Sequence, residues 1–174
     1  MRKLLIFLCF SACCSFLAAQ NPNPIQEAMT NYDYETALML INQETPTVPL
    51  LYQKGKALKG LGNNLEALSV FQEVVARDSF NPRAYIEAAE CCKSLAKYSE
   101  ALNYYQNALH INPDNKYVQI QYISLLMSMK RYRESLKESN LLAEKDSSAY
   151  ILHLRAESMG QVYDNTEIMR VIDA

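Results

Sequence analysis

The feature that most constrains the fold of this chain is a sequence pattern that repeats every thirty-four positions. The stretch KYSEALNYYQNALHINPDN at 97–115 has a counterpart one period earlier, NNLEALSVFQEVVARDSFN, and another one period later, RYRESLKESNLLAEKDSSA. Ala67, Ala101 and Ser135 mark the register, because each occupies the same slot of its stretch. A fixed period of this size is typical of proteins that stack one small structural unit many times.

Each unit reads as two helices joined by a tight turn. In the clearest unit, two apolar faces have the spacing of helical surfaces, with residues at 85, 88, 89 and 92 on the first and at 98, 101, 102, 105, 108 and 109 on the second. Pro82 opens the first helix and Pro113 follows the second. One such pair cannot bury both of its apolar faces, so it must stack on another pair.

At these residues the sequence resembles the tetratricopeptide repeat (TPR) family, whose pattern W-x2-L-G-x2-Y…A-x3-F…P has the same period. Unit 82–115 offers Tyr85, Ala88, Ala89, Cys92, then Ala101-x3-Tyr105 and Pro113. Unit 48–81 offers Leu51, Gly55, Leu58, Gly62 and Ala67-x3-Phe71. Unit 116–149 keeps Tyr132 and Ser135 at the turn and is otherwise degenerate.

The resemblance implies an all-α fold, a right-handed α-solenoid of about five antiparallel helix pairs that covers residues 20–174. The two outer pairs are expected to be irregular. The step from Ala37 to Ala67 is shorter than the period, and laying Tyr150 on Tyr85 puts Thr166 in the alanine slot, also less than one period after Ser135.

Residues 1–19 have a different character and are predicted to be a signal peptide. Arg2 and Lys3 precede the uncharged run LLIFLCFSACCSFLAA, which is shorter than the roughly 20 residues that span a bilayer. Cleavage after Ala19 would leave Gln20 first, in a protein that is exported to the periplasm or cell envelope, or secreted. Two alternatives are an uncleaved membrane anchor and a lipoprotein, in which FSAC presents Cys13 for lipidation. For the exported protein, lipidation at Cys13 is the only membrane contact expected.

The cysteines outside that segment are not expected to form a disulfide. Cys91 and Cys92 are adjacent in a predicted helix, so their Cα atoms are about 3.8 Å apart and their side chains diverge. Disulfides usually need a Cα separation of at least about 4.4 Å. We therefore expect two small, buried packing residues.

The sequence carries no motif of an enzyme or of a cofactor site. His110 and His153 have no Cys, Asp or Glu at metal-ligand spacing, and there is no glycine-rich phosphate loop or G-x-S-x-G elbow. Loss of Arg2 and Lys3 changes the net charge from −2 to −4, and no basic run follows, which argues against a nucleic-acid partner. We expect a non-enzymatic protein without cofactor or metal.

The resemblance also implies a partner-binding groove along the first helix of each pair. The stripe beside the packing face gives the predicted groove residues: Tyr52, Lys56, Lys59, Arg83, Ile86, Lys93, Ile120, Met127, Ile151 and Arg155. One position of the stripe would form an apolar track, with Tyr52, Ile86, Ile120 and Ile151 in successive repeats. The stripe also contains five basic residues and a single acidic residue, Glu90. The alternative is that these apolar residues fill gaps between first helices and the basic residues are ordinary surface.

The function expected from the sequence is therefore a scaffold that docks a protein or peptide partner on this groove in the cell envelope. The Lys and Asn pair with which some family members grip chaperone tails is not matched. Two alternatives remain open: the exported sensory segment of a signalling receptor, and a lipid-anchored envelope assembly factor.

Overall fold

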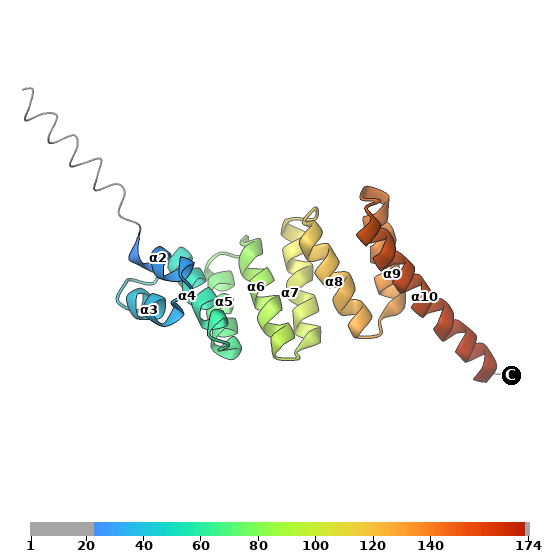
Figure 1. The fold of residues 1–174 in the computed structure, drawn as a ribbon, viewed down its shortest axis with the longest axis horizontal. Helices are drawn as coiled ribbons and strands as arrows, with labels where there is room; N and C mark the ends of the chain where they lie inside the picture. The colour runs from blue at the N-terminus through green and yellow to red at the C-terminus, as the bar shows by residue number, and fades with distance from the viewer. Residues whose placement is uncertain (1–22, 173–174) are drawn as a thin grey trace, which may run out of the picture. The chain divides into compact units, whose positions relative to one another are not determined.

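The computed structural model describes residues 23–172, with side chains through Asp164, and every regular element in that range is a helix. The chain divides after Pro46 into two compact units, each of which is described by itself. The predicted signal peptide at 1–19, including Cys13, lies outside the described residues. The all-α fold class is confirmed (Figure 1).

In the first unit, the described residues from 23 onward form one helix pair, α2 (Pro24–Thr30) and α3 (Tyr34–Ile41). The side chains of Asn23 and Asp33 cap the two helices by accepting hydrogen bonds from backbone N–H groups in the first turn. Tyr32, between the helices, has a φ of 60°, so the chain reverses through a left-handed residue.

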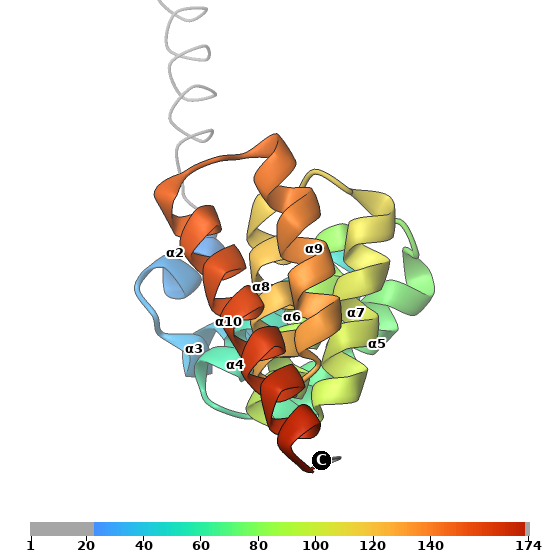
Figure 2. The ribbon, with the colours of Figure 1, turned by 90° about the vertical axis from the view of Figure 1, so that its right-hand side faces the viewer.

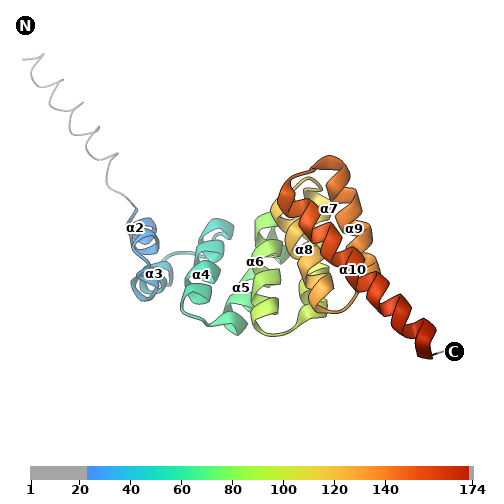
Figure 3. The same cartoon turned by 45° about the vertical axis from the view of Figure 1, so that its right-hand side comes forward.

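The second unit contains three regular helix pairs and one long helix. In order these are α4 (Val48–Gly60), α5 (Asn64–Arg77), α6 (Pro82–Ser94), α7 (Tyr98–Ile111), α8 (Lys116–Ser128), α9 (Tyr132–Lys145) and α10 (Ala149–Ile172). Figures 1 and 3 show α4 to α9 following one another along the unit, each beside the next. Seen from its α10 end in Figure 2, α10 lies beside α9 and crosses in front of α8.

The turns inside the three pairs repeat with the sequence period. Gly62, Ala96 and Lys130, which are each one period apart, all have positive φ, at 81°, 57° and 59°. In each turn the next residue donates its N–H to a carbonyl five residues back, as Asn63 does to Leu58 at 2.9 Å, which closes a Schellman-type cap. Asn81 and Asn115 cap the following first helices through their side-chain oxygens.

Small residues let the helices of each pair approach closely. Ala67, Ala101 and Ser135, in the slot that defines the period, are fully buried. Gly55 faces the buried ring of Phe71 so closely that an added Cβ would lie 2.7 Å from two of its ring atoms. The helix contact predicted from the period is therefore confirmed in all three pairs.

The predicted fifth pair is wrong, because α10 continues as one helix of 24 residues through the expected turn. Its buried residues Ile151, Leu154 and Ser158 match positions 85, 88 and 92 of α6 only when Ile151, rather than Tyr150, is laid on Tyr85. In this alignment, Val162 occupies the turn position at which Ala96 and Lys130 have positive φ. A β-branched residue strongly disfavours positive φ, which is a physical reason for the helix to continue.

Candidate functional site

The candidate site is the face that α4, α6 and α8 turn away from their paired helices. The structure exposes Lys56 and Arg83 on this face, and it half-buries most of the other predicted groove residues: Tyr52, Lys59, Ile86, Lys93, Ile120 and Met127. Arg155 of α10 is also half-buried, and its Nε is buried without a hydrogen-bond partner among the residues described.

Polar bridges with the sequence period join the first helices to one another. Lys59 of α4 forms an ion pair with Glu87 of α6, and one period later Lys93 of α6 donates to the Gln121 Oε1 of α8 at 2.8 Å. The Tyr52 hydroxyl also donates to Glu87, at 3.3 Å, while the Tyr52 ring packs edge-on against Phe71 with 5.8 Å between centroids. Burial, reinforced by the Glu87 carboxylate, raises the pKa of Tyr52 to about 12.

Glu90 is the centre of a second cluster on the same face. Its carboxylate accepts hydrogen bonds from the hydroxyl of Tyr105, from the hydroxyl of Tyr117 at 3.2 Å, and from Lys93 at 3.3 Å. Burial by itself would raise the pKa of Glu90, but the Tyr105 hydrogen bond and the Lys93 charge outweigh it and the pKa is lowered. Burial and the same contacts raise the pKa values of Tyr105 and Tyr117. Glu90 is therefore held as a carboxylate inside the protein's own network.

These contacts change the expected charge of the groove. Lys59 forms an ion pair with Glu87. Lys93 forms an ion pair with Glu90 and donates a hydrogen bond to Gln121, so neither lysine is free to attract a ligand. The sequence pattern identifies Glu90 as the one acidic residue of the predicted groove, but it does not identify Glu87. The signal that could have found it is the spacing from Lys59 to Glu87, which equals the spacing from Lys93 to Gln121.

Ile151 is not a groove residue, and that prediction is corrected. Its side chain is 1% exposed and lies in a core cluster with Ile123, Leu142 and Leu154. The one-residue error in the α10 register rotated the predicted stripe by about 100° and brought a core position onto it. Ile120 packs against the same cluster, and Met127 accepts a hydrogen bond from Ser158 at 3.4 Å, so the continuous apolar track is not present.

A pocket of about 330 Å³ opens beside the first predicted groove residues, at the amino-terminal ends of α4 and α6. It is lined by Val48, Pro49, Tyr52, Gln53, Asp78, Asn81 and Arg83. Asp78 accepts hydrogen bonds from the Phe80 N–H and the Asn81 side chain. Arg83 and the nearby exposed Lys56 form no ion pair with any residue in the part of the chain described here. The pocket therefore combines apolar walls with the unpaired guanidinium of Arg83 and with the carboxylate of Asp78, which accepts hydrogen bonds from its own turn.

The described part of the chain holds neither a metal-binding cluster nor a membrane-spanning helix. Within it, no three His, Cys, Asp or Glu side chains come together as a metal site, and no helix has the length and apolar character to cross a bilayer. Cys91 and Cys92 are free and fully buried, as expected, and burial raises the pKa of each thiol to about 11.

Comparison with known proteins agrees with this architecture. Sequence models described as tetratricopeptide repeat match residues 48–81 and 94–157. No curated protein matches the chain by sequence. Among solved structures, the fold is similar to that of MamA, at 14% identity and a TM-score of 0.66, over 83% of this chain and 87% of that one.

Two further similar structures are of tetratricopeptide repeat proteins. A tetratricopeptide repeat protein from Parabacteroides merdae is 17% identical, with a TM-score of 0.73 over 86% of this chain and 61% of that one. YrrB, described as a TPR protein, is 14% identical, with a TM-score of 0.67 over 76% of this chain and 71% of that one. These structures agree in fold, and the two sequence models, which together match more than half of the chain, show that it belongs to the tetratricopeptide repeat family.

Proposed function

We propose that this protein is an exported, non-catalytic scaffold that holds an acidic segment of another protein on the α4–α6 part of its first-helix face. Its tetratricopeptide repeats support a protein–protein interaction role. A peptide ligand is further supported by the similarity in fold to YrrB, which is described as having an unusual peptide-binding site.

The observation that carries the proposal is the 330 Å³ pocket that contains Tyr52 and Arg83. Its volume lies at the lower end of the range of ligand pockets, so it suits one or two side chains of a partner. Val48, Pro49 and the Tyr52 ring would bury the apolar part of such a segment. Arg83 and Lys56 would attract its carboxylates, because both are exposed and their charges are not neutralised within the described structure.

The test is a charge reversal, Lys56→Glu with Arg83→Glu, in the purified protein. A partner would first be isolated from envelope extract, and its affinity for both proteins would then be measured by calorimetry at low and moderate salt. We expect affinity to fall about tenfold in the variant, and the salt dependence to weaken, since exposed charges are screened over about 8–10 Å.

A matched control makes the same change in charge elsewhere. Arg133→Glu with Lys137→Glu reverses one Arg and one Lys that are exposed on α9. If this control weakens binding as much as the first variant does, the effect is one of net charge and the proposed site is wrong.

Export is a separate part of the proposal and rests on residues 1–19. Amino-terminal sequencing of the native protein should begin at or near Gln20, and a sequence that still begins at Met1 would contradict cleavage. Palmitate labelling that is lost on Cys13→Ser would instead support the lipid-anchored assembly factor, in which FSAC is the processing site.

A further inference from the structure

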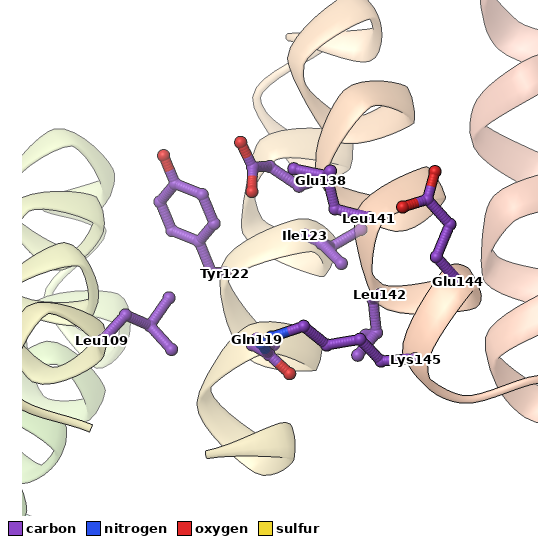
Figure 4. A pocket seen from close by; sticks show the side chains of 9 residues that line it. All are labelled: Leu109, Gln119, Tyr122, Ile123, Glu138, Leu141, Leu142, Glu144 and Lys145. Atoms are coloured by element: carbon purple, nitrogen blue, oxygen red, sulfur yellow. The ribbon is translucent and has the colours of Figure 1, made fainter. Parts of the chain in front are cut away.

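A second pocket lies on a different side of the protein, among α7, α8 and α9 (Figure 4). Its volume is about 270 Å³, and it is lined by Leu109, Gln119, Tyr122, Ile123, Glu138, Leu141, Leu142, Glu144 and Lys145. Tyr122 is nearly opposite Ile120 and Ser124 around α8, because two residues advance a helix by about 200°. The pocket is therefore separate from the first-helix face.

Comparison with the preceding repeat explains why this space is open. The residues one period before Gln119 and Glu138 are Tyr85 and Tyr104, whose rings pack together with 6.4 Å between centroids. Replacing two large rings by an amide and a carboxylate removes that filling. The pocket is thus a departure of the third repeat from the pattern of the second.

The hydrogen bonds of the two repeats differ in a related way, because the tyrosine that accepts from a glutamine is on the second helix of one repeat and on the first helix of the next. Gln72 donates to the Tyr104 hydroxyl at 3.0 Å, whereas its counterpart Gln106 donates to the hydroxyl of Tyr122 at 2.7 Å. Tyr122 stands where the second repeat has Ala88, and it is 7% exposed. Tyr122 thus accepts the hydrogen bond that Tyr104 accepts one repeat earlier, and it lines the pocket from α8.

The charges around the pocket favour a cationic occupant. Two of the nearby cations are paired: Lys145 contacts Asp114 at 3.0 Å, and Arg131 donates twice to Glu134, at 2.7 and 2.6 Å. Within the described residues, Glu138 and Glu144 of the lining take part in no ion pair. The lining thus holds two carboxylates outside any ion pair and one lysine, Lys145, that is paired with Asp114.

We propose that this pocket receives an arginine side chain of a bound peptide or protein, flanked by aliphatic residues. The arginine stem would lie on Leu109 and Leu141, which are on either side of Tyr122 in Figure 4, and its guanidinium would donate to Glu138. A pocket of this volume is small for a cofactor and suits a single long side chain. This pocket would therefore bind a cationic side chain, whereas the α4–α6 face is proposed to bind an acidic segment.

The test uses two acetylated peptides, Gly-Leu-Arg-Leu-Gly and its counterpart with Glu in place of Arg, titrated into the purified protein with methyl NMR detection. The arginine peptide should shift the methyl signals of Leu109, Leu141 and Leu142, and the glutamate peptide should not. Glu138→Gln should weaken the arginine peptide about five- to tenfold, which corresponds to about 1–1.4 kcal/mol. The control Glu66→Gln removes an exposed carboxylate of α5 that does not line the pocket, and it should leave binding unchanged.

A second variant fills the pocket with the protein's own side chains. Gln119→Tyr with Glu138→Tyr introduces the two rings that the second repeat has at these positions, so it should lose the peptide-induced shifts while its helix content stays that of wild type. Lys56→Glu with Arg83→Glu should bind the arginine peptide as wild type does, which separates this site from the proposed first-helix site. Equal binding of the two peptides, or unchanged binding by Glu138→Gln, would overturn the assignment.

Discussion

Gly55 lies in the middle of α4 with the ring of Phe71 directly against its Cα. We predict that Gly55→Ala destabilises the protein by about 1–3 kcal/mol, because the added methyl group would overlap a ring that is fully buried and cannot move aside. Gly160→Ala is the matched control, since a Cβ at Gly160 meets nothing within 4 Å, and it should stabilise α10 by about 0.5–1 kcal/mol. Urea unfolding of the two variants measures both effects, and shifts in the same direction would contradict the packing described.

The same residue pair shows what the sequence could and could not predict at this scale. The sequence placed Gly55 and Phe71 in the family pattern without pairing them, and the structure brings them together, with the small residue on the first helix and the large one on the second. One period later the same positions hold Ala89 and Tyr105, which are both buried. In the third repeat the sizes are exchanged, with Ile123 on α8 and Ser139 on α9, and both are buried. A pattern that scores each position separately finds this repeat degenerate, whereas packing depends on the combined volume of the two residues.

Cys91 and Cys92 provide a second prediction for individual residues. Burial raises the pKa of each thiol to about 11, so at pH 8 less than about 1% of either is thiolate, the form that reacts. Iodoacetamide at pH 8 should therefore leave both unmodified in the folded protein and alkylate both in concentrated urea. Mass spectrometry would count the modified thiols, and rapid alkylation of the native protein would show that this part of α6 opens.

At the scale of elements, the first helices are joined by polar contacts whose strength depends on pH. We predict that Glu90→Gln destabilises the protein by about 1–2 kcal/mol at pH 7, because the hydrogen bonds from Tyr105 and Lys93 lose their charged acceptor. The pKa of Glu90 is lowered in the folded state, so its contribution is present above the unfolded pKa of about 4.3 and is lost as pH falls through the folded value. The difference between wild type and variant should therefore shrink below about pH 4.

The control for this prediction is Glu73→Gln on α5. Glu73 forms an exposed ion pair with Arg77 at 2.6 Å, and exposed pairs of this kind contribute about 0–1 kcal/mol. Denaturation series at several pH values would compare the two variants. A Glu90→Gln effect as small as that of Glu73→Gln would mean that the cluster around Glu90 does not hold α6 and α8 together.

The helices also show where reading the sequence fails. Boundaries from α4 to α9 follow from caps and turn residues that recur with the repeat period, so the sequence predicts them well. For α10 the repeat is weak, and an error of one residue in the alignment turns the predicted face by about 100°. That error placed Ile151 in the groove and a turn where the helix continues.

At the scale of the molecule, the period predicts the fold class because each stacked pair in the second unit contacts mainly its neighbours in the chain. It does not predict the candidate site equally well. Whether Lys59 and Lys93 face solvent or pair with Glu87 and Glu90 depends on side-chain conformations between helices, which no helical spacing specifies. The same holds for the α7–α9 pocket, which exists because two tyrosines of one repeat are absent from the next.

Neighbour-to-neighbour packing makes a prediction about the second unit as a whole. Ala101 is fully buried where α7 meets its paired helix, so Ala101→Leu should overpack this contact and cost about 1–3 kcal/mol. Because repeats are stabilised by the interfaces on either side, hydrogen exchange should accelerate in α6 and α7 and also in α5 and α8. Ala76→Leu on the exposed side of α5 is the control and should change neither the thermal melt nor the exchange. A melt of Ala101→Leu that matches wild type would show that the helix contact is wrong, and faster exchange limited to α7 would show that the stacked pairs are not coupled.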